Sequence, residues 1–356
     1  MSAASSVVFA AVHMGPYQTL APLEPLVDGP VLYAVDGIAR RHRAGRGEAF
    51  ADAAAIAREG GASAFFAKHQ VRGLVRGTSD DVDGENLEDV LSAAAVAQGL
   101  PVIAVEDFPG NFGSPNAGSV DALCVEAETM VAIHAARGVP EARIHVTGNP
   151  RYDALRQVDA KTRRGLTRGA LGLGDEPVAL WVGQPDSEDS FRTLEHVLPA
   201  LKAARTTLLF RAHPRDPGCM AGRYGSLLAG AGTPVRDVTT TADVTGLCCA
   251  ADLVVTQFSS VAVEAGYLGT PALFALFPDL GGAYMRRRKG YAIPPWCKEK
   301  CAFLLDDAKM AAVVVDGAMH DPEAREAVRV NFAQRYATRP QSAASVARII
   351  TSSLKG

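Results

Sequence analysis

The feature of this sequence that most limits its fold is the regular alternation of short β-branched runs with longer alanine-rich segments of helical period. Such alternation is typical of βαβ units, in which helices connect the parallel strands of one sheet. The pattern runs to about Gly148 and restarts after a linker near residues 148–164. A chain of 356 residues also exceeds what one hydrophobic core usually serves. The predicted fold is therefore α/β, with two Rossmann-like domains that each contain a parallel sheet.

We place the first domain at residues 1–153 and the second at residues 154–330. The tail, residues 331–356, has helical period and is expected to pack back onto the first domain. The expected strands are Val7–Val12, Val31–Val35, Gly73–Arg76, Val102–Val105, Ala122–Val125, Arg143–Val146, Val178–Val182, Thr207–Arg211, Leu253–Thr256 and Ala272–Phe274. The expected helices are Thr19–Leu26, Phe50–Arg58, Leu87–Gln98, Glu128–Arg137, Phe191–Ala203 and Ser260–Leu268.

Charge and composition argue against several classes of function. The formal net charge is −3 and the only dense basic run is 286–289, so nucleic acid is not an expected partner. No segment approaches the roughly 20 apolar residues that span a bilayer, and the amino terminus lacks the basic region of a signal peptide. The six cysteines are scattered without the spacing of a zinc site or a disulfide framework. We therefore expect a cytoplasmic enzyme with reduced thiols and neither a metal nor another cofactor.

In doubly wound sheets, ligands bind beyond the carboxyl ends of the strands. The residues that directly follow each expected strand are therefore the first candidates for a site. Five segments qualify: His13-Met14-Gly15, Gly77-Thr78-Ser79, Glu106-Asp107, Arg211-Ala212-His213-Pro214 and Gln257-Phe258-Ser259-Ser260.

The most informative segment is ADLVVTQFSSVAVEAGYLGTPAL, residues 251–273, in which an apolar strand leads into two serines that open a helix. Ser259 and Ser260 offer hydroxyls where the unpaired N–H groups and the dipole of a helix favour a phosphate. Glu264, one helical turn later, can accept hydrogen bonds from a ribose diol. The alternative is that the serines only cap the helix and that Glu264 is solvated.

A second candidate in this half is the sequence LLFRAHPRD, in which His213 directly follows a strand. A histidine at this position can donate to a phosphate or assist departure of the leaving group. Arg211 is a candidate for a further phosphate contact. On the His-Pro pair alone, a purely structural histidine is the alternative.

In the first half, Glu106 and Asp107 follow an apolar strand, and either could act as the general base that deprotonates an acceptor hydroxyl. Adjacent carboxylates on a turn point in different directions, so at most one is expected to face the substrate. The alternative is that they cap the turn. Further candidates for substrate binding are Thr78 and Ser79 after the third strand and His13 and Gly15 after the first.

These motifs resemble known families. Residues 251–273 resemble the carboxy-terminal signature of the UDP-N-acetylglucosamine 2-epimerases, with Ser259 and Ser260 at that signature's glycine pair and Glu264 at its ribose-binding glutamate. The paired serines are more similar to the corresponding segment of CDP-glycerol glycerophosphotransferases and of bacterial sialyltransferases. The resemblance implies a GT-B fold, in which two Rossmann-like domains face a central cleft, and catalysis without a metal.

The same resemblance implies a glycosyltransferase-like enzyme of polysaccharide biosynthesis. It would move a sugar or sugar-like group from a nucleotide-activated donor, such as a nucleotide sugar, to a hydroxyl of a small-molecule or glycan acceptor. The runner-up is a 2-epimerase, although the chain has Ala-Val-His-Met-Gly-Pro where that family carries Gly-Thr-Arg-Pro-Glu. The third hypothesis is a non-catalytic protein that binds a nucleotide sugar.

Overall fold

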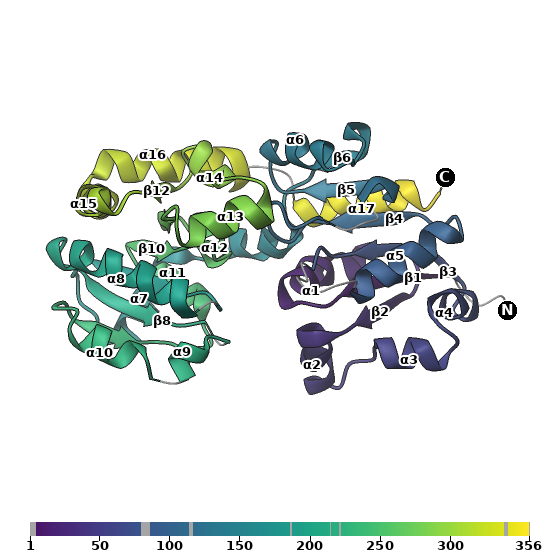
Figure 1. Cartoon of the computed structure of the whole chain (residues 1–356), viewed down its shortest axis with the longest axis horizontal. Helices are drawn as coiled ribbons and strands as arrows, with labels where there is room; N and C mark the ends of the chain where they lie inside the picture. The colour runs from purple at the N-terminus through teal and green to yellow at the C-terminus, as the bar shows by residue number, and fades with distance from the viewer. Residues whose placement is uncertain are drawn as a thin grey trace. The chain divides into compact units, whose positions relative to one another are not determined.

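A computed structural model describes residues 5–79, 86–113, 117–185, 187–213, 215–220, 222–337 and 341–355. The chain divides into two compact units (Figure 1). The first unit comprises Met1–Asp153 together with Arg339–Gly356, and the second comprises Ala154–Thr338. Pro214, which belongs to one of the candidate segments, lies outside the described residues.

The first unit is built on a parallel sheet of six strands in the order β2-β1-β3-β4-β5-β6. Its strands are mostly apolar because helices cover both faces, as is usual for parallel sheets. All six residues of the central strand β1 are buried, for example. The strands are β1 (Ser6–Ala11), β2 (Val31–Val35), β3 (Val71–Arg76), β4 (Val102–Val105), β5 (Ala122–Val125) and β6 (Ile144–Val146).

Helices cover the two faces of this sheet. Helix α5 packs against β1, β3 and β4 on one face, whereas α1, the 3-10 helix η1 and α17 share a core with the strands on the other. The helical elements of the unit are α1 (Met14–Leu20), η1 (Ala21–Leu26), α2 (Gly37–Gly45), α3 (Ala53–Arg58), α4 (Ala62–Lys68), α5 (Leu87–Ala97), η2 (Ala117–Ser119), α6 (Thr129–Ala136), η3 (Glu141–Arg143) and α17 (Ser342–Ser353).

The segment Thr19–Leu26, expected as one helix, is for most of its length a 3-10 helix and not an α-helix. The α-helix α1 starts earlier, at Met14, and the chain continues from Ala21 as the 3-10 helix η1. Pro22 and Pro25 lie inside this segment and lack the N–H groups that an α-helix would need.

Helix α17 joins the first unit although it is far from it in sequence. The backbone N–H groups of Ser342 and Ala343 donate to the two carboxylate oxygens of Asp153, at 3.0 and 2.8 Å. Val346 and Ile350 on the same helix are fully buried in the core of the first unit. The carboxy-terminal helix therefore completes the layer that covers β4 and β5 (Figure 1).

The second unit also has a six-stranded parallel sheet, in the order β12-β11-β10-β7-β8-β9. Counted from β7, the first strand of the unit, this is the common Rossmann order 6-5-4-1-2-3. The strands are β7 (Val178–Val182), β8 (Thr207–Arg211), β9 (Val235–Asp237), β10 (Leu253–Thr256), β11 (Ala272–Ala275) and β12 (Phe303–Leu305). The helical elements are η4 (Pro150–Gln157, which begins in the first unit), α7 (Ala160–Ala170), α8 (Ser187–Ala203), α9 (Pro217–Met220), α10 (Tyr224–Ala229), α11 (Val244–Ala250), α12 (Val261–Tyr267), α13 (Gly281–Lys289), α14 (Pro295–Lys298), η5 (Ala308–Met310), α15 (Ala311–His320), α16 (Pro322–Phe332) and η6 (Ala333–Ala337).

The two parallel sheets with helices on their faces confirm the predicted α/β class. Within the described residues, no helix combines the length and the apolar character needed to cross a membrane.

Candidate functional site

Each sheet has one point at which the strand order reverses, and crevices at such points are the usual ligand sites of doubly wound folds. In the first unit this point lies between β1 and β3, and in the second between β7 and β10. The residues just beyond these strands include most of the candidates from the sequence. The structure therefore places the candidates in two clusters, one at the carboxyl edge of each sheet.

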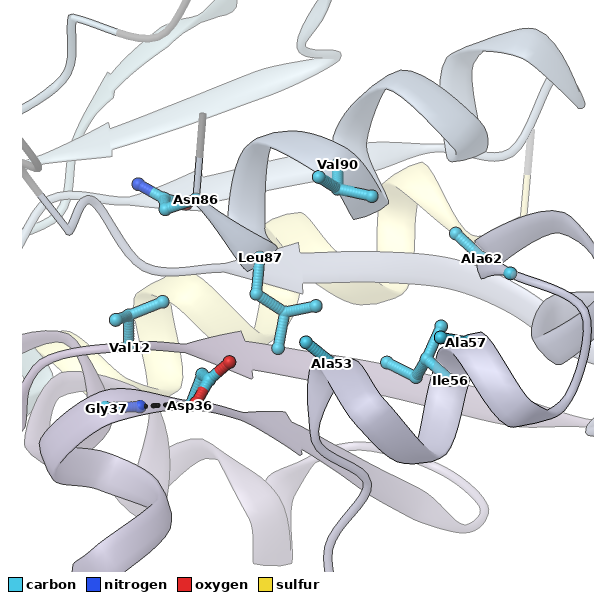
Figure 2. Close-up of a pocket in the computed structure, with 11 residues that line it drawn as sticks. Val12, Asp36, Gly37, Ala53, Ile56, Ala57, Ala62, Asn86, Leu87 and Val90 are labelled. Carbon is cyan, nitrogen blue, oxygen red and sulfur yellow. Dashed lines mark hydrogen bonds between the residues drawn. The ribbon is translucent and has the colours of Figure 1, made fainter. Parts of the chain in front are cut away.

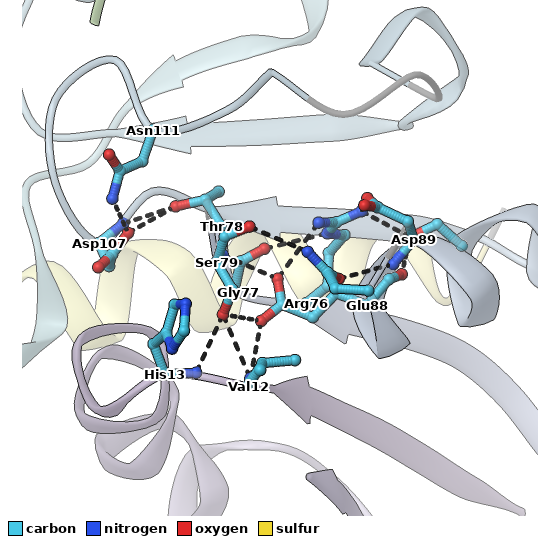
Figure 3. Close-up of polar contacts among 12 residues, drawn as sticks. Val12, His13, Arg76, Gly77, Thr78, Ser79, Glu88, Asp89, Asp107 and Asn111 are labelled. Carbon is cyan, nitrogen blue, oxygen red and sulfur yellow. Dashed lines mark hydrogen bonds and ion pairs between the residues drawn. The ribbon is translucent and has the colours of Figure 1, made fainter. Parts of the chain in front are cut away.

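Asp107 is the polar centre of the cluster in the first unit (Figure 3). Its Oδ1 accepts hydrogen bonds from the Thr78 hydroxyl at 2.8 Å and from the Asn111 side chain at 2.9 Å. Its backbone N–H donates to Thr78 Oγ1 at 3.1 Å, and its backbone carbonyl accepts from the buried Asn149 side chain at 3.0 Å. Asp107 is nevertheless partly exposed, so a rigidly held carboxylate reaches the surface at this sheet edge.

Gly15 lies directly against this carboxylate. A Cβ atom at Gly15 would lie only 2.3 Å from Asp107 Oδ2, which no real contact allows. The first turn of α1 therefore approaches Asp107 closely because residue 15 has no side chain. Gly15 shapes the cluster through its backbone.

Ser79 joins the ends of β1 and β3. Its hydroxyl accepts from the N–H groups of Val12 at 3.2 Å and His13 at 3.1 Å, and it donates to the buried carboxylate of Glu88. The Ser79 hydroxyl is thus engaged within the protein and holds the turn that carries His13. His13 itself is partly exposed and follows β1 at this edge of the sheet (Figure 3).

A buried ion-pair network lies behind this turn. The Arg76 guanidinium contacts Glu88 at 3.2 Å and Asp89 at 2.8 Å, and it also donates to the Ser92 hydroxyl at 3.1 Å. Arg76 and Glu88 are almost fully buried. A buried charge without its partner is costly, so this network fixes the start of α5 and, through Glu88, the position of Ser79.

Glu106 points away from Asp107. It is buried, and its Oε1 accepts from Gly110 N–H at 2.7 Å and from His134 Nε2 at 2.6 Å. The two adjacent carboxylates therefore diverge, as expected for a turn, and of the two only Asp107 is partly exposed. Sequence reasoning passed over Glu126, which directly follows β5 and is also buried, although its position after a strand was the available signal.

A pocket of about 510 Å³ lies next to the polar cluster (Figure 2). Val12 lines the pocket and also donates its N–H to Ser79. Asp36 and Asn86 provide polar groups at one end, and the other side chains are largely apolar. The pocket was not predicted, because its walls combine the consecutive helices α3 and α4 with Val12, Asp36 and α5 from other parts of the sequence.

In the second unit, Ser259 and Ser260 lie partly exposed between β10 and helix α12. The Ser259 hydroxyl accepts from Val261 N–H at 3.2 Å and so caps the helix, whereas Ser260 makes no side-chain capping bond. Glu264 is 8% exposed, which excludes the alternative of a solvated carboxylate. The structure thus supports the capping alternative for Ser259 only.

Gln184 was missed by the sequence reasoning. It follows β7 and is buried, and its side chain donates to Thr256 Oγ1 at the end of β10 at 3.4 Å. Thr256 Oγ1 also accepts from Ser259 N–H at 3.3 Å. Gln184 thus lies across the point at which the strand order reverses, next to the serine turn. The signal was its place directly after a predicted strand, in the sequence VGQP.

His213 follows β8 and is held by the backbone. Its Nδ1 accepts from Arg215 N–H at 3.1 Å, so the hydrogen of the neutral ring lies on Nε2. Burial, with the nearby charge of Arg215, lowers the pKa of His213 to about 4. The side chain is therefore a neutral Nε2–H donor at neutral pH.

Arg211 has a different environment from the one we expected. Its Nη1 donates to the backbone carbonyls of Val238 and Thr239, both at 3.2 Å, and of Thr241 at 2.5 Å. Burial lowers the pKa of Arg211, and the charge of Glu264 acts in the opposite direction. Arg211 thus fixes the loop between β9 and α11 and lies within electrostatic range of Glu264.

No group of three or more His, Cys, Asp or Glu side chains in the described part of the chain could hold a metal ion. All six cysteines are free thiols. The absence of a cofactor stays a prediction.

Comparison with known proteins identifies a family. The sequence profile of the CDP-Glycerol:Poly(glycerophosphate) glycerophosphotransferase family matches residues 111–350, about two thirds of the chain. No protein of curated function matches the sequence.

Solved structures share the fold at low sequence identity. The UDP-GlcNAc 2-epimerase from Neisseria meningitidis, bound to UDP-GlcNAc, is 13% identical with a TM-score of 0.67, over 98% of this chain and 99% of that chain. Anabaena Alr3699/HepE in complex with UDP and glucose is 14% identical, with a TM-score of 0.65 over 99% of each chain. The wall teichoic acid polymerase TagF is 14% identical, with a TM-score of 0.58 over 99% of this chain and 89% of that chain. These neighbours confirm the predicted GT-B class.

Proposed function

Because the chain belongs to the CDP-glycerol:poly(glycerophosphate) glycerophosphotransferase family, we propose that it transfers a glycerophosphate-like group from a CDP-activated donor to an acceptor hydroxyl. The family confirms the predicted class, a transferase that uses a nucleotide-activated donor. The transferred group and the roles of single residues are our proposal. The sugar donor expected from the sequence becomes the second candidate, favoured by the structural likeness to HepE, which was solved with UDP and glucose.

The observation that carries the proposal is the Rossmann order of the second sheet within the matched residues. The order supports the proposal because Ser260, which is partly exposed, follows β10 at the point where the strand order reverses, and such folds commonly hold nucleotide phosphates at this point. We assign Ser259 and Ser260 to the donor's phosphates and Glu264 to its ribose. His213 follows β8, which lies two strands from β10, or about 10 Å along the sheet edge. At that distance, the Nε2–H group of His213 can donate a hydrogen bond to the donor phosphate that lies farther from the serines as the nucleotide leaves.

We assign the acceptor to the first unit. The Asp107 carboxylate takes the proton of the acceptor hydroxyl, and the hydroxyl oxygen forms a bond to the β-phosphorus of the donor. The bond between that phosphorus and the bridging oxygen of the diphosphate breaks, so CMP leaves. Thr78 and Asn111 hold one oxygen of the Asp107 carboxylate, which supports its role as a positioned base. We assign His13 and the Gly15 backbone to binding of the acceptor, because both follow β1 and Gly15 lies directly against Asp107.

The identity of the leaving nucleotide tests this assignment. The purified chain is incubated with CDP-glycerol and a short glycerophosphate acceptor, and nucleotides are separated by ion-exchange chromatography. Transfer of a glycerophosphate group from CDP-glycerol releases CMP, whereas transfer of a sugar from a nucleoside diphosphate sugar releases a nucleoside diphosphate. Acceptor-dependent CMP release is the expected result. Release of UDP or CDP from a nucleotide sugar, with no CMP from CDP-glycerol, would establish the second candidate.

Variants separate the two halves of the proposal. Asp107→Asn is expected to lower kcat by roughly 10²–10⁴-fold and to leave donor affinity unchanged. Ser260→Ala is expected to weaken donor binding about tenfold, since a hydrogen bond to a charged group contributes roughly 1.5 kcal/mol or more. Asp28→Asn and Ser226→Ala, both at exposed positions, are the matched controls. Conversion of UDP-N-acetylglucosamine to its 2-epimer without an acceptor would instead support the epimerase hypothesis.

A further inference from the structure

The first unit contains a buried histidine–carboxylate pair that the proposed reaction does not use directly. The side chains of Glu106 and His134 are both 0% exposed, and Glu106 Oε1 lies 2.6 Å from His134 Nε2. Since a carboxylate oxygen only accepts, the ring hydrogen lies on Nε2. In the described part of the structure, His134 Nδ1 has no hydrogen-bond partner, so Glu106 is the polar group that orients the ring.

This pair connects helix α6 to the turn that carries Asp107. Glu106 Oε1, which accepts from His134, also accepts from Gly110 N–H at 2.7 Å. Arg137, directly after α6, donates to the carbonyls of Gly110 at 2.8 Å and Phe112 at 3.0 Å. His134 on α6 therefore holds this segment at the Glu106 side chain, and Arg137 holds it at two backbone carbonyls.

The ring of His134 also supports the far end of this segment. Phe112 packs edge-on against the ring at a centroid separation of 6.3 Å, and the Arg76 guanidinium lies 5.5 Å from the Phe112 ring. Between these fixed points, Asn111 donates to Asp107 Oδ1 at 2.9 Å. A shift of the turn would thus move both the Asp107 backbone and one of the groups that orient its carboxylate.

We propose that His134 is a positioning residue for the transfer reaction, acting through Glu106 on the turn that places Asp107. The inference rests on the proposed function, because it takes Asp107 as the base. A buried polar pair of this kind contributes little net stability compared with apolar residues of similar volume. Its benefit lies in geometry, since a displacement of the carboxylate by about 1 Å can lower the rate roughly 100-fold.

The test is a double-mutant cycle of His134→Ala and Asp107→Asn, measured as kcat and KM for the acceptor and as Kd for the donor. If His134 acts through Asp107, His134→Ala lowers kcat at least tenfold in the parent chain and less than twofold in the Asp107→Asn background. The Kd for the donor stays unchanged in every variant. His134→Gln, which keeps a side-chain N–H donor, is expected to restore at least part of the lost kcat.

A control distinguishes positioning from a general loss of stability. Ile350→Val, in the core of the same unit but on α17, is compared at a temperature at which it and His134→Ala are both fully folded by circular dichroism. Should His134→Ala not fold, Glu106→Gln carries the same cycle. Equal losses from His134→Ala in both backgrounds, or an equal loss in Ile350→Val, would overturn the inference. An unchanged kcat in Asp107→Asn alone would instead overturn the assignment of the base.

Discussion

At the scale of single residues, the contact between Gly15 and Asp107 makes a small residue critical. The Cβ of Gly15→Ala would lie 2.3 Å from Asp107 Oδ2, so the carboxylate or the turn of α1 must move. We expect kcat to fall at least tenfold with donor affinity unchanged, because a displaced base loses its alignment. Steady-state kinetics and donor titration measure the two quantities.

The control for this substitution is Gly45→Ala, because a Cβ at Gly45 would meet no atom within 4 Å. Gly45 is the last residue of α2 in the same unit. The Gly45→Ala variant should therefore retain the kcat of the parent protein. A parent-like kcat in Gly15→Ala would show that the Asp107 carboxylate is not held in a fixed position against α1.

The lowered pKa of His213 predicts a pH dependence of stability. In the unfolded chain this histidine takes up a proton near pH 6.5, and in the folded chain only near pH 4. Below pH 6.5 the unfolded state therefore binds more protons, so this contribution to stability is lost as the pH falls from about 6.5 to about 4. The melting temperature of His213→Asn should fall less than that of the parent between pH 7.5 and pH 5. Parallel melting curves for the two proteins across this range would contradict the prediction.

The position of a candidate residue at the sheet edge could be predicted from the sequence, but the hydrogen bonds of its side chain could not. The rule that ligands bind beyond strand ends correctly placed Asp107, Thr78 and Ser260 at the carboxyl edges of the sheets, because their place depends only on topology. It could not separate Glu106 from Asp107, since that choice is made by His134, 28 residues away in the chain. Ser79 was expected to meet substrate, yet its hydroxyl is taken up by partners whose proximity only the folded chain reveals.

At the scale of secondary structure elements, the cap on α17 is formed by a residue from a distant part of the chain. Asp153 accepts two backbone hydrogen bonds at the start of this helix. We expect Asp153→Ala to cost about 1–2 kcal/mol in the free energy of unfolding, as for other N-caps. Residues 341–355 should also become more accessible to protease, which mass spectrometry of the fragments can detect.

Asp159→Ala provides the comparison, because Asp159 caps α7 through an exposed hydrogen bond to Thr162 N–H at 3.0 Å. It removes an N-cap of the same chemistry from the second unit. Early cleavage of the carboxy-terminal segment in this variant would mean that the segment is released by any loss of stability, not by loss of its cap.

The central strands of both sheets were predictable, whereas the two edge strands of the second sheet were not. Strands such as β4 and β7 are continuous apolar runs buried on both faces, and their predicted bounds match the observed ones. Strands β9 and β12 have only three residues each and lie at the two edges of the second sheet. Runs this short show no periodicity in the sequence, so whether they form strands depends on pairing with a neighbouring strand.

At the scale of the whole molecule, the first unit is discontinuous in sequence, since it comprises Met1–Asp153 and Arg339–Gly356. Removal of residues 339–356 should therefore destabilise the first unit, although the residues that precede the cut belong to the second. Val346 and Ile350 are fully buried, and burial of each such side chain contributes about 1.5–3 kcal/mol. Their combined loss is a large part of the roughly 5–15 kcal/mol that usually separates folded from unfolded domains.

Hydrogen exchange followed by mass spectrometry measures this effect unit by unit. In the truncated chain, the amides of β1 and β4 should exchange faster than in the parent, whereas those of β7 and β10 should keep the parent's rates. The full-length Val346→Ala/Ile350→Ala variant should show the same pattern more weakly, because it keeps the helix and its cap but removes the buried side chains. If β7 and β10 lose protection first, or if β1 and β4 keep theirs, the carboxy-terminal helix is not an integral part of the first unit's core.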